Sequence, residues 1–478
     1  MSKKNQNYTN RKQNRFQPER MRGNIFVNNS GKQWLPGKNG RAAKVERLLR
    51  GLEKKEIAGN MAGYKDSGIE YIGQVPKDWE VLRLKNISNI YAAKEYLFGE
   101  WPVEKNGKPY SPFGEWSSGN EVIITGRVGT IGQYEMLEKN PKKKILINDN
   151  RLLIRPFTED YRKKALSHFL FWAMAIVNLN DIITGSAVPL ITATSLLKKR
   201  IVVPPLSEQQ RIADFLDTKC GILDRTIDAV SQQIEDLEKY KKALITKTVT
   251  KGIYKKGEPE RAMKDSGVEW IGEVPEEWSV KRLKYVLDSI RNGASAASYE
   301  YEPGSFRYVR ITDIDDNGNL KQTGKQYLPK EMAKNFILNK KAVLIANTGS
   351  LGKAMLFDPD KEDEVCALNG HLIEAIANPN IISNEYLYFF IKSYNYINWV
   401  NRSYVQTTMQ MLSAGRHKNL PVTVPPLAEQ QQIADYLDEK CKNIDNRVQK
   451  RRQQLEWLKE YKKSLIFDYV TGKKRVEK

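Results

Sequence analysis

Two stretches of the chain carry apolar residues at alternating spacings of three and four. A seven-residue repeat of this kind is typical of a coiled-coil seam, and about 40 helical residues span about 60 Å. Neither helix can bury its apolar stripe alone, so we expect the two helices to pack against each other. The predicted seam positions are Leu216, Leu223, Ile227, Ile234 and Leu237 in the first stretch and Leu437, Ile444, Val448, Leu455 and Leu458 in the second.

A pair of prolines precedes each predicted helix. Pro205 and Pro426 each follow another proline, and this residue is excluded from helix interiors but suits the first turn. In the first copy Ser207 is placed to supply an N-cap oxygen, whereas Ala428 takes that position in the second. We therefore expect the first helix to be capped by Ser207 and the second to be capped poorly.

The segments before these helices alternate short β-like runs with turns. EVIITG from Glu121, FRYVRITDI from Phe306 and AVLIAN from Ala342 favour strands, and DDNGN from Asp315 favours a turn. Apolar stretches such as HFLFWAMAIV from His168 favour buried helices. The pattern predicts an α+β protein, with two mixed α/β domains and two long helices.

The chain is a tandem duplication. KDSGIEYIGQVPKDWEVLRLK from Lys65 returns as KDSGVEWIGEVPEEWSVKRLK from Lys264. VPPLSEQQRIADFLDTKC from Val203 returns as VPPLAEQQQIADYLDEKC from Val424. We call these matching segments the frame. Repeats on this scale decide the architecture, here two similar halves related by a pseudo-two-fold repeat.

Between the frame segments lie two middles, residues 87–202 and 286–423, that share little. One short echo connects them, TGRVGTIG from Thr125 and ANTGSLGK from Ala346. Two copies of one frame with different middles indicate two similar tasks with different specificities. Trp79 and Trp278 occupy the same frame position, so we expect them to pack in the core.

The charge balance favours a polyanionic partner. The net charge is +21 and the sequence pI is about 9.5, so lysines and arginines are available to neutralise phosphates. The first 60 residues carry 15 basic and 4 acidic side chains, a net of 15 − 4 = +11, which leaves +10 for the remainder. A basic ribosomal or membrane-surface protein would show the same excess, so charge alone does not decide.

The composition also indicates a cytoplasmic protein. No apolar run is long enough to span a membrane, and no apolar stretch follows the basic start as in a secretory signal. Cys220, Cys366 and Cys441 are too scattered for a disulfide framework. Cys220 and Cys441 share one seam position, where we expect buried apolar filler.

Residue patterns that carry chemistry are sparse. His168, His371 and His417 show no metal-ligand spacing. GSLGKA from Gly349 lacks the glycine spacing of a phosphate-binding loop, and Ala354 stands where a serine or threonine would bind magnesium. We interpret that segment as a turn between strands, and we expect no catalytic residue and no metal site.

The frame motifs, together with GSAVPLITATSLLKKRIVVPPLSEQQRIADFLD from Gly185, resemble the specificity subunits of type I restriction–modification systems over residues 61–478. The resemblance implies two target recognition domains separated by two long antiparallel helices. Each domain is expected to read one half of a split site in double-stranded DNA. Two methyltransferase subunits and further restriction (translocase) subunits are the implied partners. S-adenosylmethionine, ATP and magnesium would be bound by those partners and not by this chain.

The expected domain boundaries follow from the repeat and the resemblance. Residues 1–60 form a basic, largely disordered extension, 61–204 the first recognition domain and 205–256 the first helix. Residues 257–424 form the second recognition domain and 425–478 the second helix. The extension would be either without a role or an additional contact to phosphates or to a partner.

Polar side chains in the middles are the candidate DNA contacts, since Arg, Lys, Asn, Gln, Ser and Thr reach base edges and phosphates. The regions carry more weight than the individual residues. The candidates are Arg127, Thr130, Ser186, Thr192 and Lys198 in the first half and Arg307, Arg310, Thr312, Asn317, Thr348, Ser350, Lys353, Tyr404, Gln406 and Thr408 in the second.

Two other functions stay open from the sequence. A coiled-coil scaffold without DNA specificity would explain the helices and the repeat, but not the basic excess or the divergent middles. A decayed or regulatory relative of the specificity subunit would keep the fold and lose the methylation partners. Salt-sensitive binding to duplex DNA separates recognition from scaffolding.

Overall fold

The structure is a computed structural model, and it divides the chain into two compact units. It describes residues 22–23, 63–92, 104–105, 108–109, 121–126, 131–137, 151–157, 165–185, 189–254, 257, 259, 261–315, 318–349, 352–403 and 412–476. Unit 1 comprises residues 1–227 and 457–478, and unit 2 comprises residues 228–456. The expected extension, 1–60, lies outside the described residues apart from 22–23.

The main sheet of unit 1 has the strand order β1-β9-β8-β10-β5, and every neighbouring pair is antiparallel. Helices α2 (Ser167–Met174) and α3 (Ala193–Leu197) and the 3-10 helix η4 (Asn180–Ile182) follow it. A small hairpin pairs β6 (Glu104–Lys105) with β7 (Lys108–Pro109). The strands of the main sheet are β1 (Arg22–Gly23), β5 (Ser88–Ala92), β8 (Glu121–Thr125), β9 (Tyr134–Leu137) and β10 (Arg151–Pro156).

The main sheet of unit 2 has the order β15-β21-β18-β19. Its strands are β15 (Leu287–Asn292), β18 (Ala342–Ala346), β19 (Ala354–Phe357) and β21 (Leu372–Ala377). Unit 2 adds a second sheet, β17-β16-β20, in which β16 runs parallel to β20. Its strands are β16 (Phe306–Val309), β17 (Tyr327–Leu328) and β20 (Cys366–Leu368).

Short helices complete unit 2. They are η6 (Ile311–Asp313), α5 (Lys330–Ala333), η7 (Pro359–Lys361), α6 (Asn384–Ile391), α7 (Tyr394–Ser403) and α8 (Ala414–His417).

The two main sheets have the same topology. Across the sheet, the order β5-β10-β8-β9 in unit 1 corresponds to β15-β21-β18-β19 in unit 2. In both units the first, second, third and fourth of these strands along the chain occupy the same places in the sheet. The sequence echo lies between β8 and β9 in unit 1 and between β18 and β19 in unit 2. The main sheets of the two middles therefore share a topology although their sequences differ. In unit 2 the strands of the second sheet lie between β15 and β21 in the chain.

The frame segments form small ladders beside each sheet. In unit 1, β2 (Tyr64–Asp66) pairs with β3 (Gln74–Pro76), and β4 (Glu80–Arg83) pairs with β11 (Arg200–Val203) before the 3-10 helix η2 (Leu84–Asn86). Unit 2 has the same ladders. In it, β12 (Met263–Asp265) pairs with β13 (Glu273–Pro275), and β14 (Ser279–Arg282) pairs with β22 (Pro421–Val424) before the 3-10 helix η5 (Leu283–Tyr285). These ladders join the start of each half to the strand that leads into its long helix.

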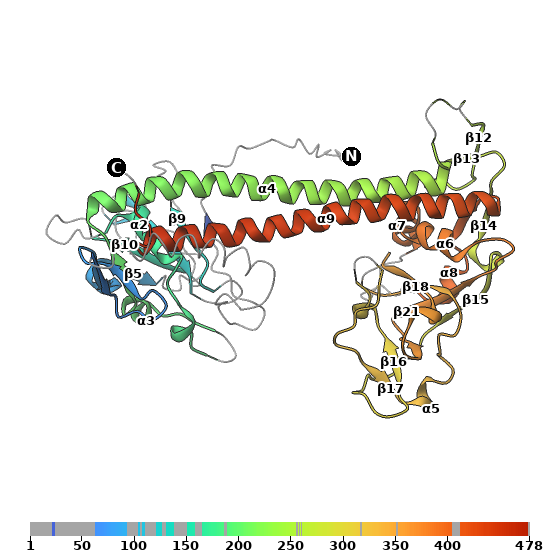
Figure 1. Ribbon diagram of the computed structural model, residues 1–478, viewed down its shortest axis with the longest axis horizontal. Helices are drawn as coiled ribbons and strands as arrows, with labels where there is room; N and C mark the ends of the chain where they lie inside the picture. Colours follow the sequence, from blue (N-terminus) through green and yellow to red (C-terminus); the bar gives the residue numbers. More distant parts are fainter. Residues whose placement is uncertain are drawn as a thin grey trace, which may run out of the picture. The chain divides into compact units, whose positions relative to one another are not determined.

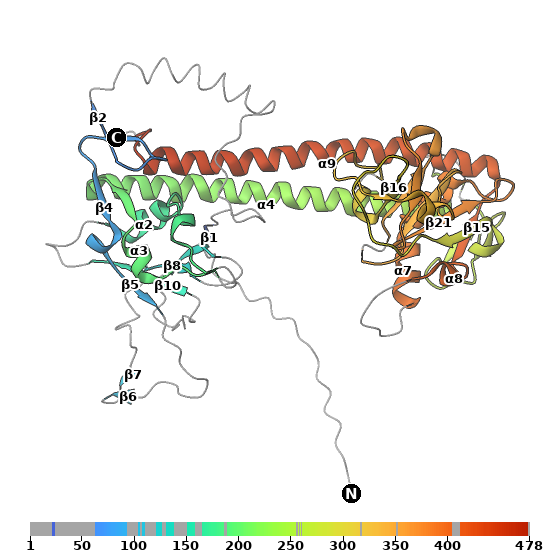
Figure 2. The ribbon, with the colours of Figure 1, turned by 90° about the horizontal axis from the view of Figure 1, so that it is seen from below.

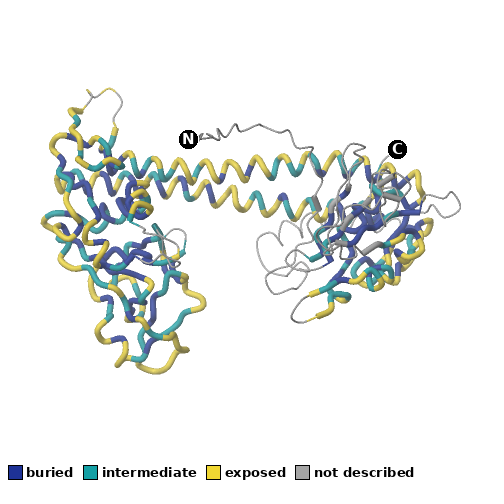
Figure 3. Tube along the Cα trace, turned by 180° about the vertical axis from the view of Figure 1, so that it is seen from behind, coloured by how far each residue is buried: buried dark blue, intermediate teal, exposed yellow. Residues whose placement is uncertain are grey.

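The predicted long helices are α4 (Leu206–Lys251) and α9 (Leu427–Val470), and they run side by side within each unit (Figure 1). In unit 1 the ring of Phe215 lies 4.4 Å from that of Tyr469, and Lys462 Nζ lies 2.6 Å from Asp224. As the residue numbers of the contacts rise along α4, those of their partners fall along α9, so the helices are antiparallel. The predicted seam positions are buried or half-buried, and the outer faces are exposed (Figure 3).

The prediction that Ser207 caps the first long helix was wrong. α4 begins at Leu206 and the amide of Glu208 donates to Pro205 O, so Ser207 lies within the first turn instead of capping it. No helix among the described residues is both long and apolar enough to cross a membrane.

Each unit has its own apolar core, and the frame tryptophan lies in it as predicted. Trp79 and Trp278 are fully buried. Gly472, just after α9, has φ +70°, and a Cβ there would lie 2.6 Å from Pro76 Cδ and 3.0 Å from Trp79. The end of α9 therefore packs directly on the first frame segment of unit 1.

Candidate nucleic-acid interface

The repeated Pro-Pro-Leu-x-Glu-Gln motif fastens each long helix to its own recognition domain. In unit 1 the indole Nε1 of Trp79 donates to Glu208 Oε2 at 3.0 Å, and in unit 2 that of Trp278 donates to Glu429 Oε2 at 2.9 Å. The motif glutamate thus satisfies the polar atom of the otherwise apolar tryptophan at its buried position. These glutamates were not among the predicted site residues.

The neighbouring glutamine holds the middle through the main chain. Gln209 is fully buried; its Oε1 accepts from the amide of Leu166 at 2.9 Å and its Nε2 donates to Pro204 O at 2.7 Å. Leu166 is the N-cap of α2, so the contact satisfies an amide at a helix start.

Gln430 makes the equivalent contacts in unit 2, accepting from the amide of Ser383 at 2.8 Å and donating to Pro425 O at 2.8 Å. Ser383 is the N-cap of α6. The signal for this role was the Glu-Gln pair in both copies of the motif, but the sequence did not reveal its main-chain partners.

Within each unit the structure brings together two segments that the sequence identified separately as candidate DNA contacts. In unit 1 the amide of Ile191 donates to Gly126 O at 2.7 Å, joining the segment before α3 to the turn after β8. In unit 2 the amide of Leu412 donates to Asn347 O at 2.9 Å, joining the segment before α8 to the turn after β18. In each unit the described parts of the echo turn and of the segment that leads into a short helix therefore meet. We call this junction the composite loop surface; its described residues are Gly126, Ile191 and Thr192 in unit 1 and Asn347, Thr348, Leu412 and Ser413 in unit 2.

The short helix beyond each composite surface has a side-chain cap. Thr192 is exposed and caps α3 by accepting from the amide of Ser195 at 3.1 Å. Ser413 caps α8 in the same way, accepting from the amide of Arg416 at 3.4 Å. The candidate Lys198 is the exposed C-cap residue of α3.

In unit 2 the echo turn carries a polar cluster. Thr348 Oγ1 lies 3.1 Å from His371 Nδ1, and the buried Asn347 donates from Nδ2 to Gly370 O at 2.9 Å. His371 was not predicted to belong to this surface, since it lies 23 positions after Thr348 in the sequence. Lys353 is half-buried at the far end of the turn, which is a hairpin between β18 and β19 as interpreted from the sequence.

Arg307 is a correction to the candidate set. Its side chain is only 2% exposed, its guanidinium pairs with Glu362, and it also donates to Lys321 O. Residue 307 lies in β16, the middle strand of the second sheet, so its side chain is held in the protein and cannot reach a base edge. Arg310 forms a two-point pair with Asp313 and donates to Gly324 O, while the neighbouring Thr312 is exposed.

The remaining candidates fall outside the described residues. They are Arg127, Thr130, Ser186, Asn317, Ser350, Tyr404, Gln406 and Thr408.

The two seam cysteines, Cys220 and Cys441, are buried and free. Burial raises the pKa of Cys220 to about 12 and that of Cys441 to about 11, which keeps both seam thiols protonated and unreactive. Among the residues that the structure describes, no group of three or more His, Cys, Asp or Glu side chains is arranged to hold a metal ion.

Comparison with known proteins gives a consistent result. The pattern of the type I restriction modification DNA specificity domain matches residues 76–239 and 275–456. The type I restriction enzyme MjaVIII specificity subunit of Methanocaldococcus jannaschii is 24% identical over 430 residues, covering 84% of this chain and 95% of that protein. The EcoBI specificity subunit of Escherichia coli is 23% identical, covering 77% of this chain and 80% of that one.

A solved structure, from work on complex assembly and conformational transition of the type I R-M system, has the same fold. It aligns with a TM-score of 0.56 and 16% identity, covering 83% of this chain and 99% of that one. The domain match covers most of the chain and occurs once in each half. This protein therefore belongs to the family of type I restriction–modification specificity subunits.

Proposed function

We propose that this chain is the DNA-recognition subunit of a type I restriction–modification complex, and that each unit reads one half of a bipartite site in double-stranded DNA. The observation that carries the proposal is the composite loop surface present in both units at the same place in the fold. It is formed through Ile191 and Gly126 in unit 1 and through Leu412 and Asn347 in unit 2. Equivalent surfaces with unlike residues are what two readers of different half-sites require.

The chain acts without a catalytic site of its own in this proposal. Its partners are two methyltransferase subunits, which dock on the frame and the long helices, and the restriction subunits of the complex. Those partners bind S-adenosylmethionine, ATP and magnesium, and the helices set the spacer between the half-sites. Support comes from the duplicated frame, since two matching docking surfaces suit two copies of one partner, and from relatives that are named specificity subunits.

The test is to co-express the chain with the methyltransferase subunit encoded beside it and to map adenine methylation across a host genome. We expect a two-part motif with a fixed spacer. Replacing residues 87–202 by the corresponding segment of a relative with another specificity should change one half of the motif and leave the other unchanged.

Two outcomes would contradict the proposal. If the complex assembles and binds S-adenosylmethionine but methylates no motif, the chain is a decayed or regulatory relative. If the chain binds duplex DNA no better than a matched acidic protein does, it is a helical scaffold. A motif that changes in both halves on replacement of one middle would refute the division of labour between the units.

A further inference from the structure

Beside each composite loop surface lies a group of exposed basic side chains that belong to the frame. In unit 1, Arg83 ends β4 and Lys85 lies in η2, on either side of the fully buried Leu84. In unit 2, Arg282 and Lys284 flank the buried Leu283 in the same way. All four charged side chains are exposed, and the Arg-Leu-Lys sequence is the same in both copies.

The second frame strand adds charge to this group. Arg200 is the direct antiparallel partner of Arg83, and both side chains are exposed. Like charges opposite each other in a ladder destabilise it, so the pair has a cost for folding alone. In unit 2, Pro421 replaces this arginine opposite Arg282, and the charge comes instead from exposed Lys418, whose carbonyl accepts from the amide of Lys284 at 3.1 Å.

These side chains have no ion-pair partner within the described part of the chain, although Lys284 Nζ lies 4.7 Å from the centre of the Tyr285 ring. No described carboxylate forms an ion pair with Arg83, Lys85 or Arg200, nor does one with Arg282, Lys284 or Lys418. The neighbouring Lys199, in contrast, forms an ion pair with Asp181. We call the two unpaired groups the basic ledges; they consist of Arg83, Lys85, Lys198 and Arg200 in unit 1 and of Arg282, Lys284 and Lys418 in unit 2.

Each ledge is continuous with the composite surface of its own unit. In unit 1, α3 packs against both β5 and η2 (Figure 2). Its C-cap residue Lys198 belongs to the ledge, and its N-cap residue Thr192 belongs to the composite surface. In unit 2 the C-cap and N-cap residues of α8, Lys418 and Ser413, have the same two places. Six residues of helix rise about 9 Å, which corresponds to two or three nucleotides at about 3.4 Å each. One DNA strand that leaves the loops therefore reaches the ledge within a few nucleotides.

We propose that the basic ledges hold the sugar–phosphate backbone of DNA and are blind to base sequence. This inference rests on the proposed function and adds to it a division between reading and gripping. A side chain repeated in two readers of different half-sites cannot specify the bases of both, whereas phosphates are the same at every sequence. An unpaired positive charge beside a base-reading loop is the group that a phosphate requires.

The test measures how DNA binding depends on salt. The full chain, assembled with its methyltransferase subunit, is titrated against a labelled duplex that contains the mapped motif. The ledge variant carries Arg83→Gln, Lys85→Gln, Arg282→Gln and Lys284→Gln. A charge-matched control variant replaces exposed lysines that lie outside the ledges, the frame and the long helices, and it carries Lys330→Gln, Lys334→Gln, Lys340→Gln and Lys361→Gln.

We expect the slope of log K against log salt to become shallower by about 3.6 in the ledge variant, about 0.9 for each of four lost phosphate contacts. The control should keep the wild-type slope, and both variants should methylate the same motif as the wild type.

Other outcomes overturn the inference. A ledge variant with the slope of the control shows that the ledges do not touch phosphates. An altered motif shows that they read bases. An unchanged slope together with loss of the methyltransferase subunit during gel filtration shows that they bind that protein instead. A wild-type complex that binds no duplex overturns the proposed function as well, which distinguishes the two failures.

Discussion

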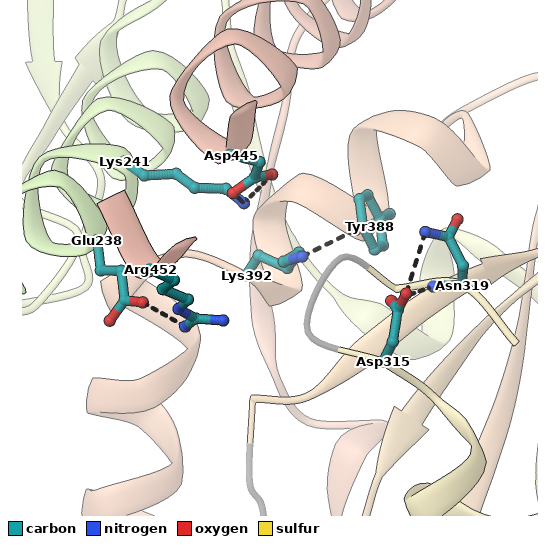
Figure 4. A network of polar contacts seen from close by, with 8 residues as sticks. All are labelled: Glu238, Lys241, Asp315, Asn319, Tyr388, Lys392, Asp445 and Arg452. Atoms are coloured by element: carbon teal, nitrogen blue, oxygen red, sulfur yellow. Dashed lines mark hydrogen bonds and ion pairs between the residues drawn. The ribbon is translucent and has the colours of Figure 1, made fainter. Parts of the chain in front are cut away.

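Lys241 of α4 and Asp445 of α9 form a two-oxygen ion pair, with Nζ 2.7 Å from Oδ1 and 2.6 Å from Oδ2 (Figure 4). Lys462 of α9 pairs with Asp224 of α4 in the same way, within unit 1. In the duplicated sequence Lys241 corresponds to Lys462 and Asp224 to Asp445. Each unit therefore contains the same ion pair, with the roles of α4 and α9 exchanged, as the duplication of the sequence predicts.

The partly buried pair should stabilise the antiparallel register of unit 2. We expect Asp445→Lys to destabilise unit 2 by about 2 kcal/mol, because it leaves Lys241 beside a second positive charge with neither partner well solvated. Adding Lys241→Glu should recover most of the loss. The measurement is a double-mutant cycle in urea, read by hydrogen exchange of peptides from unit 2.

The exposed pair of Glu238 and Arg452, at 2.8 Å on the same two helices, is the control (Figure 4). About half of each side chain is exposed, so Arg452→Gln should change the stability too little to measure. If both pairs couple equally weakly, the register is determined by the apolar seam alone and the argument from Lys241 fails.

Gln430 of the frame motif should contribute more to the stability of unit 2 than its neighbour Gln431 on the same helix. Gln430→Ala removes the acceptor for the amide of Ser383 and leaves polar atoms buried without partners, at a cost of about 3 kcal/mol in the unfolding of unit 2. Gln431→Ala, at an exposed position, is the matched control and should be nearly neutral. Equal effects of the two substitutions would mean that the buried contacts do not anchor α6.

Unit 2 should lose stability in mild acid through His417. Burial lowers the pKa of this histidine to about 4, although a hydrogen bond to Ser413 O opposes the shift, and its Nε2 lies 2.8 Å from Tyr396 Oη. Below pH 6.5 the unfolded chain binds a proton that the folded chain does not. Stability is therefore complete above about pH 6.5 and falls towards pH 4, by about 2 kcal/mol at pH 5.

His417→Gln should remove this pH dependence, because an amide keeps both hydrogen bonds without titrating. The readout is the difference in melting temperature between variant and wild type at pH 7.5 and pH 5. The exposed His371 replaced by Gln serves as the control. A wild type and a His417→Gln variant that melt in parallel at both pH values would show that this histidine is not the titrating group.

The glycine that follows α9 should be needed for two separable reasons. Gly472→Ala places a methyl group at φ +70° and 2.6 Å from the ring of Pro76, whereas Gly73→Ala has the same φ with open space around it. We expect Gly73→Ala to cost about 1 kcal/mol from backbone strain alone, and Gly472→Ala to cost about 2 kcal/mol more. Hydrogen exchange of unit 1 gives both values, and equal costs would mean that the contact with Pro76 relaxes freely.

Much of the fold followed from the repeat, because matching residues must have matching environments. The burial of Trp79 and Trp278 and the turn at the echo were predicted on this basis. Periodicity located the long helices to within a few residues, but not their first turn, since Pro205 supports a helix that begins before Ser207. The second sheet of unit 2 was not predicted, because its strands pair segments that lie far apart in the sequence and belong to a middle that shares little with the other one.

The candidate site was predictable as regions and less so as residues. Arg307 lies in a run typical of a strand, but its guanidinium is held by Glu362 and by the carbonyl of Lys321. Contacts between segments so far apart in the sequence leave no local pattern. The same limit hid His371, which reaches the echo turn only through the order of strands in the sheet. The amino-acid composition of a loop predicts that the loop is polar. Tertiary contacts decide which of its side chains remain available to contact DNA.

The glutamine contacts have a consequence for how such a protein can change. Gln209 and Gln430 hold the middles through amide groups of the main chain, which every residue except proline possesses. A foreign cassette inserted between the two frame stretches would therefore be accepted whatever its sequence, provided that a helix starts at the same point. Because the flanking stretches occur twice in the chain, two exchanges, one in each flanking stretch, can deliver such a cassette to either half, and a new specificity arises without any redesign of its support.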